Sequence, residues 1–136
     1  MVEDIEYPST EEVGRLYARI IKATGGEHGY LSKGNLEYIL DTVKDVGERV
    51  PRRQAIIKKA AFLLYNVVVI HPFVNGNKRA GFELVRLFLA ANGYALAGRS
   101  NSQYALLLDI ASGRVSAAEV ESWLGRHLTE LKEKKD

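Results

Sequence analysis

The chain has 136 residues, no cysteine and a formal net charge of +2, with 19 basic and 17 acidic side chains. This length fits one domain with its own hydrophobic core, so we expect residues 1–136 to form a single domain. The near balance of charges gives no electrostatic footprint for nucleic acid or for a membrane surface. Because cysteine is absent, disulfides, thiolate metal sites and thiol nucleophiles are excluded.

The sequence opens without a basic and apolar leader, and its longest apolar run, residues 60–70, is too short to span a bilayer. We therefore expect a cytoplasmic protein with neither nucleic acid nor a membrane as a partner. The oligomeric state stays open.

The first third of the chain predicts an arm, a helix and a loop. Residues 1–8 are mostly polar and predict an N-terminal arm. Ser9 and Glu12 have capping-box spacing and are followed by apolar residues at helical intervals, which predicts a helix from about residue 10 to 23. Residues 24–34 contain four glycines and predict a loop.

The middle of the chain predicts three helices. A short one covers about residues 36–43, and an irregular connector, 45–53, follows it. The next helix runs from about residue 52 to 69; because its second half is apolar on nearly all sides, other helices must enclose it. A further helix covers about residues 77–92, and Gly93 ends it.

Two more capping-box spacings predict the last two helices. Ser100 with Gln103 indicates a fifth helix over about residues 100–111. Ser116 with Glu119 indicates the start of a sixth.

The sixth helix carries an apolar stripe, and the tail 132–136 is expected to fray. Residues 94–98 predict a connector that is at most briefly extended, and no stretch alternates long enough to predict a strand. The result is an all-α bundle of about six helices around the central apolar helix. The stripe consists of Val120, Trp123, Leu124, His127, Leu128 and Leu131.

The most informative stretch is residues 71–81, His-Pro-Phe-Val-Asn-Gly-Asn-Lys-Arg-Ala-Gly, between the third and fourth helices. The imidazole of His71 can take up a proton near neutral pH. Glycine and asparagine tolerate a tight backbone at a helix start, where free N–H groups and the helix dipole favour an anion. Lys78 and Arg79 add two positive charges. Phosphate is the anion that this pattern indicates.

An ordinary turn between two helices is the alternative interpretation. It accounts for Pro72, Asn75 and Gly76, which are common in turns. It does not account for a histidine, an asparagine and two cations within nine residues, so we favour a phosphate site.

The stretch resembles the signature of the Fic/Doc family, H-x-F-x-[D/E]-[G/A]-N-[G/K]-R, at every position except Asn75, where the family carries a carboxylate. The run 77–79, Asn-Lys-Arg, resembles the Doc (death-on-curing) branch. The Fic branch has glycine in place of Lys78 and a second arginine in place of Phe82. The resemblance extends over most of residues 7–112.

The resemblance implies roles for the motif residues. His71 would be the general base, and Phe73 would point into the core and anchor the loop. Mg²⁺ would bridge the phosphates of ATP, with Asn75 in place of the carboxylate that holds it in the family. Residues 45–53 would form the flap that positions a target segment. Phosphate binding is implied for Gly76, Asn77, Lys78 and Arg79.

For function, the resemblance implies an ATP-dependent transferase that modifies a protein hydroxyl. Fic members transfer AMP, whereas Doc members transfer phosphate to a translation factor and pair, as toxins, with an antitoxin whose helical segment covers the groove. Asn75 leaves a second interpretation open, because an amide lacks the charge of a carboxylate. The chain would then be a catalytically degenerate regulator that binds a nucleotide or a partner.

Overall fold

The computed structural model describes residues 4–131, so the predicted tail, 132–136, and the first three residues of the predicted arm lie outside it. Within that range the chain forms six α-helices, one 3-10 helix and two short strands. The predicted all-α bundle of about six helices is confirmed. In chain order the elements are α1 (Thr10–Thr24), α2 (Lys33–Thr42), η1 (Val43–Asp45), α3 (Arg52–Ile70), α4 (Asn77–Ala91), β1 (Tyr94–Leu96), α5 (Ser100–Ala111), α6 (Ala117–His127) and β2 (Leu128–Glu130).

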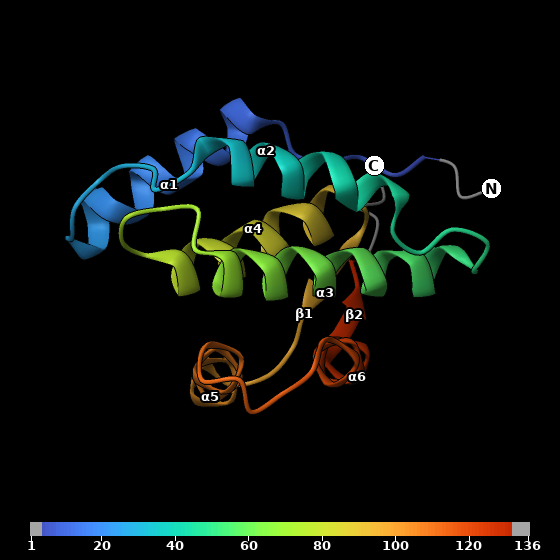
Figure 1. Cartoon of the computed structure of the whole chain (residues 1–136). Coiled ribbons are helices and arrows are strands. Elements are labelled where there is room, and N and C mark those ends of the chain that lie inside the picture. Colours follow the sequence, from blue (N-terminus) through green and yellow to red (C-terminus); the bar gives the residue numbers. More distant parts are fainter. Residues whose placement is uncertain (1–3, 132–136) are drawn as a thin grey trace, which may run out of the picture.

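Helix α3 runs through the middle of the molecule (Figure 1). It packs against α2 and α4 on one side and against α5 and α6 on the other, while α1 packs on α4. The apolar sequence of α3 explains this position, because a helix that is apolar nearly all round must be enclosed. Its buried side chains are Ala55, Ile56, Ile57, Lys59, Ala60, Ala61, Leu63, Leu64, Val67 and Val68.

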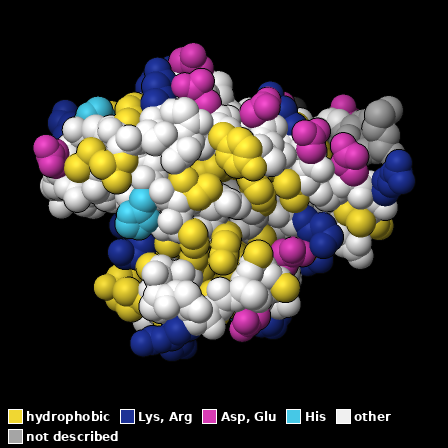
Figure 2. Space-filling model, viewed as in Figure 1, with side chains coloured by type: hydrophobic (Ala, Val, Ile, Leu, Met, Phe, Trp, Pro, Cys, Tyr) yellow, Lys and Arg dark blue, Asp and Glu magenta, His cyan; other side chains and the backbone are white. Residues whose placement is uncertain are grey.

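None of the helices within residues 4–131 combines the length and the apolar character that crossing a bilayer requires. Figure 2 shows acidic and basic side chains interspersed over the same face, without a large field of one sign. That distribution agrees with the small net charge of +2.

Two of the three predicted capping boxes are present, Ser9 with Glu12 at α1 and Ser116 with Glu119 at α6. The third prediction, Ser100 with Gln103 at α5, is wrong. Ser100 is itself the first helical residue, and the cap position is held by Arg99 without a side-chain hydrogen bond. A serine inside the helix cannot cap it, because the capping side chain belongs to the extended residue before the first turn.

The end of the predicted sixth helix is also wrong. Helix α6 ends at His127, and Leu128–Glu130 is a strand, β2, that pairs antiparallel with β1. Leu96 lies opposite Leu128, and Tyr94 lies opposite Glu130. The apolar spacing continued the helical pattern, but the paired segments are far apart in the sequence, and local periodicity does not report such pairing.

The described part of the predicted arm, residues 4–8, is fastened to the end of α4. The backbone N–H of Glu6 donates to Asn92 Oδ1 at 2.8 Å, and Asn92 Nδ2 donates to the Glu6 carbonyl at 2.9 Å. The ring of Tyr7 packs on the ring of Phe88, with 6.2 Å between their centroids. Residues 4–8 are therefore part of the folded structure.

Lys59 on α3 is a buried cation that holds the segment after α2. Its ammonium donates to the carbonyl oxygens of Val43 and Lys44, at 3.1 Å each, and to that of Val46. It also lies 5.3 Å from the centroid of the Tyr7 ring. Carbonyl oxygens at the end of a helix carry the negative end of its dipole, which compensates the buried charge.

We expect Lys59→Met to lower the free energy of unfolding by about 1–3 kcal/mol, because three carbonyl oxygens lose their donor. Urea denaturation measures the loss. The control is Lys58→Met, which removes a partly exposed ion pair with Glu121 (3.0 Å) and should lower the free energy by less than about 1 kcal/mol. Equal losses for the two variants would contradict this role of Lys59.

Candidate active site

The motif loop, residues 71–76, joins α3 to α4. The residue at each end of the loop has a left-handed backbone conformation. His71, directly after α3, has φ 58° and ψ 62°. Gly76, directly before α4, has φ 77° and ψ 19°. The first conformation is uncommon for a residue with a Cβ, and such backbone strain concentrates at functional sites. The second suits glycine; a Cβ at Gly76 would also lie 3.1 Å from Ile21 Cδ1.

Two side chains hold the loop from inside. Phe73 is fully buried, and its ring stacks on that of Tyr17 with 3.8 Å between centroids. Asn77, also buried, accepts from the Phe73 N–H at 3.0 Å and donates to the Phe73 carbonyl at 2.8 Å. Because both ends of the Asn77 amide are used in this way, its side chain shapes the loop.

Three charged or titratable side chains of the motif face solvent, one directly after α3 and two in the first turn of α4. Within residues 4–131, no side chain caps the first turn of α4, so its N–H groups and the positive end of the helix dipole are available to an anion. His71, Lys78 and Arg79 are exposed. Arg79 Nε lies 3.4 Å from Glu83 Oε1 in an exposed ion pair. Such pairs contribute little stability, so a stronger anion can replace the carboxylate.

The predicted flap lies in the wrong place. The connector between η1 and α3, which corresponds to the predicted 45–53, lies at the start of the 19-residue helix α3, and His71 lies at its end. At 1.5 Å per residue these two places are roughly 27 Å apart. Figure 1 shows the connector and the motif loop at opposite ends of α3.

The segment that does lie beside the motif loop is 25–32, between α1 and α2. The N–H groups of Leu31 and Ser32 donate to the Pro72 carbonyl, at 2.8 and 3.1 Å, and the Val74 N–H donates to the Gly29 carbonyl at 2.9 Å. A Cβ at Gly29 would lie 3.3 Å from Val74 Cγ2, so glycine permits this close approach. The density of glycines in this segment was the signal in the sequence.

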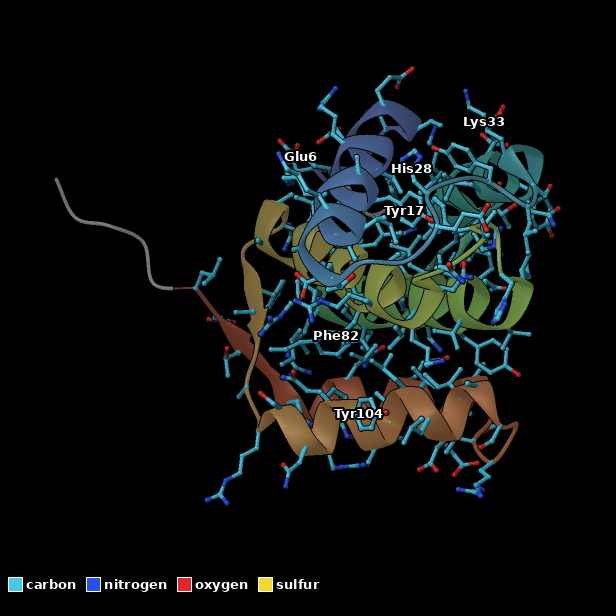
Figure 3. The ribbon with its side chains drawn as sticks, turned by 90° about the vertical axis from the view of Figure 1, so that its left-hand side faces the viewer. Glu6, Tyr17, His28, Lys33, Phe82 and Tyr104 are labelled. Carbon is cyan, nitrogen blue, oxygen red and sulfur yellow. The ribbon has the colours of Figure 1, made fainter. Side chains whose placement is uncertain are left out.

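Tyr17 on α1 supports the motif loop, a role that sequence reasoning missed. Its hydroxyl donates to the Asn75 carbonyl at 2.9 Å, and the carbonyls of Glu27 and Gly29 are both 3.3 Å away. A hydroxyl has one proton, so the nearest oxygen is the main acceptor. Tyr17 and His28 lie close together in Figure 3, with 5.1 Å between ring centroids. Tyr17 thus joins the motif loop to segment 25–32.

Asn75 is exposed, but its amide is engaged. Its Oδ1 accepts from the Glu27 N–H at 2.7 Å, and its Nδ2 donates to the Val74 carbonyl at 3.0 Å. Among residues 4–131, no three His, Asp or Glu side chains gather closely enough to hold a metal ion. One neutral oxygen that already accepts a hydrogen bond does not fit the carboxylate site that Mg²⁺ prefers.

Phe82 lies close to the motif in the sequence, whereas His127 and Trp123 lie on α6. Phe82, at the position of the second arginine of the Fic branch, is buried on α4 (Figure 3), so this position adds no charge. His127 is engaged within α6: its ring stacks on Trp123 with 3.9 Å between centroids, and its Nδ1 lies 2.7 Å from the Trp123 carbonyl. Trp123 itself is buried in the core.

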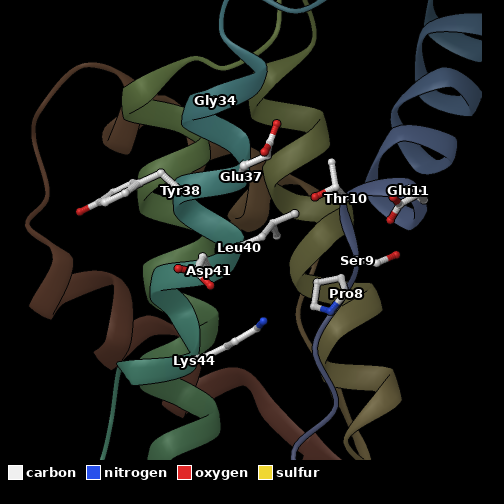
Figure 4. Close-up of a pocket in the computed structure, with 10 residues that line it drawn as sticks. All are labelled: Pro8, Ser9, Thr10, Glu11, Gly34, Glu37, Tyr38, Leu40, Asp41 and Lys44. Atoms are coloured by element: carbon white, nitrogen blue, oxygen red, sulfur yellow. The ribbon is translucent and has the colours of Figure 1, made fainter.

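A cavity of about 610 Å³ opens between α2 and the start of α1 (Figure 4). No residue of 71–79 lines it. Its charged lining consists of three acids and one base: Glu11, Glu37, Asp41 and Lys44. Excess negative charge disfavours a phosphate group, so we base the candidate active site on the motif loop.

We expect Tyr17→Phe to lower the free energy of unfolding by about 1 kcal/mol, because the Asn75 carbonyl loses a donor while the stacked ring stays. Hydrogen exchange should also become faster at the amides of Glu27 and Val74. Tyr38→Phe is the control, since Tyr38 is 59% exposed on α2. If the two variants match in urea denaturation and exchange, the hydroxyl of Tyr17 does not hold the loop.

Comparison with known proteins gives a match at the level of the family. The model of the family described as "Fic/DOC family" matches residues 7–89, which include α1 to α3, the motif loop and most of α4. No curated protein matches the chain significantly. The match covers more than half of the 136 residues and contains both loops of the candidate site. The chain belongs to the Fic/DOC family.

Proposed function

We propose that this protein transfers a phosphoryl group from ATP to a hydroxyl group of a target protein. Membership of the Fic/DOC family supports a Fic-type transferase function. Lys78 in the motif and Phe82 in place of a second arginine support the Doc type of reaction, which is phosphoryl transfer.

One observation carries the proposal: within the motif, residues 71–79, some side chains are buried and hold the backbone while others are exposed. Phe73 and Asn77 are buried and fix the backbone, while His71, directly after α3, and Lys78 and Arg79, in the uncapped first turn of α4, are exposed. A fixed backbone that presents a base and two cations to solvent suits transfer of a charged group, because the reacting groups are positioned before the substrate arrives.

The proposed reaction uses His71, Lys78 and Arg79. His71 takes the proton from the target hydroxyl, whose oxygen attacks the γ-phosphorus of ATP. The bond from that phosphorus to the bridging oxygen breaks, and ADP leaves. Lys78, Arg79 and the N–H groups of the first turn of α4 neutralise the negative charge on the phosphates. Attack at the α-phosphorus would instead release pyrophosphate and leave AMP on the target, which is the Fic-type alternative.

Mg²⁺ was also expected from the family resemblance. The residue available for it is Asn75, a neutral amide whose oxygen already accepts the Glu27 N–H. We therefore assign no step to a metal ion. The same observation favours a second candidate function, a regulator that binds a nucleotide or a partner without turnover.

The partners are part of the proposal. A Doc-type enzyme would modify a protein target such as a translation factor, and an antitoxin would cover its groove with a helical segment. Such a pair would act in the cytoplasm.

We expect the wild-type protein to transfer label from γ-labelled ATP to a protein in a cell lysate, and His71→Ala to lower the rate at least about 100-fold, because a general base contributes that much. The measurement is autoradiography after incubation. His127→Gln is the control, since His127 packs against Trp123 on α6, away from the motif loop.

Other outcomes separate the alternatives. Transfer of α-label that depends on His71 would support attachment of AMP. Label that appears with Asn75→Asp and not with the wild type would identify a catalytically degenerate member. If neither label is transferred by the wild type or by Asn75→Asp, the transferase proposal fails and the regulator remains.

A further inference from the structure

We propose that this site holds nucleotide phosphates without a divalent cation bound to the protein, and that Asn75 acts instead as a latch between the motif loop and segment 25–32. The first half rests on the proposed function, because it takes ATP as the ligand. The latch is a property of the protein alone.

The hydrogen bonds of Asn75 are the first evidence that it joins the motif loop to segment 25–32. Its Oδ1 accepts the Glu27 N–H at 2.7 Å, and its backbone carbonyl accepts the Tyr17 hydroxyl at 2.9 Å. Its Nδ2 donates to the Val74 carbonyl at 3.0 Å, a bond that a carboxylate cannot make. The amide thus donates and accepts, and it fixes segment 25–32 to the loop that holds His71.

Close packing supports the same role. A Cβ at Gly26, which has φ 101°, would lie 3.4 Å from both Cβ and Oδ1 of Asn75. Segment 25–32 therefore approaches the side chain closely at two successive residues, Gly26 and Glu27. The Asn75 oxygen accepts the Glu27 N–H and lies close to Gly26, which is a poor arrangement for collecting the six oxygen ligands of Mg²⁺.

The charges of the site allow phosphate binding without a metal. Lys78 and Arg79 supply two positive charges, and the uncapped first turn of α4 supplies the positive end of a helix dipole. Glu83, whose Oε1 lies 3.4 Å from Arg79 Nε, is the anion that a phosphate would replace. In this proposal, cationic side chains and backbone N–H groups neutralise the negative charge of the phosphates in place of a metal ion.

Glu27 is the acid to test as a substitute metal ligand. Its backbone N–H is the group that Asn75 holds, so its side chain begins next to the motif loop. A carboxylate supplied from there would restore a metal site, which is the opposite of the proposal. Glu27→Gln removes that carboxylate and keeps the backbone bond.

The test of metal-free binding is calorimetric titration with ATP, in buffer with Mg²⁺ and in buffer with EDTA, on variants that also carry His71→Ala to prevent turnover. With Asn75 and Glu27 unchanged, we expect affinities that differ less than about twofold, because Lys78 and Arg79 do not require a metal. Glu27→Gln should behave in the same way. Asn75→Asp should bind at least about tenfold more weakly in EDTA than in Mg²⁺, because it places a carboxylate beside the phosphates.

Two results would overturn metal-free binding. One is an affinity that falls more than about twofold in EDTA with Asn75 unchanged. The other is a loss of affinity in Glu27→Gln that is confined to the Mg²⁺ buffer. Binding that requires Mg²⁺ would remove this inference and leave the proposed function standing. If ATP binds in neither buffer, the proposed function falls as well.

The latch is tested without nucleotide, by hydrogen exchange at the Glu27 amide. We expect protection in the wild type and in Asn75→Asp, whose carboxylate still accepts the N–H, and at least about tenfold faster exchange in Asn75→Ala. Urea denaturation of Asn75→Ala establishes that the fold persists. Equal exchange in the wild type and in Asn75→Ala would show that Asn75 does not hold segment 25–32.

Discussion

The candidate site depends on one small clamp, in which the side chain of Asn77 bonds to both backbone groups of Phe73. The loop lies between two helices, so helical hydrogen bonds do not hold its backbone. The Asn77 side chain bonds to the Phe73 backbone in their place. With Phe73 packed on Tyr17 beneath it, the clamp holds the loop backbone from which the exposed side chains of the motif project.

The same device recurs where other irregular segments meet the helices. The buried polar side chains within residues 4–131 are Lys59, Asn77 and Asn92, and each bonds to the backbone of a segment outside the α-helices. Asn92 holds the N-terminal segment, Lys59 holds the segment after α2, and Asn77 holds the motif loop. Because each group is satisfied, burial of a polar atom here specifies geometry at little loss of stability.

Much of the fold could be predicted, because its signals are local. The apolar circumference of α3 predicted an enclosed central helix, and Ser9 and Ser116 marked where α1 and α6 begin. Two of the failures share a physical cause, whereas the third, the capping box at Ser100, misread a local signal. Strand β2 forms because it pairs with β1. The flap was misplaced because the segment that contacts the motif loop, 25–32, is far from that loop in the sequence. Neither pairing leaves a periodic pattern.

The motif residues could likewise be named from the sequence, whereas their supports could not. Tyr17 looks like one more apolar position of α1, yet its hydroxyl joins the motif loop to the segment after α1. Asn75 looks like a lost metal ligand when the motif is considered alone. In the structure its amide accepts the Glu27 N–H and donates to the Val74 carbonyl, a pair of bonds that a carboxylate cannot make. A substitution in a signature can therefore change the bonding of the loop as well as its charge, and only the neighbouring segment distinguishes the two effects.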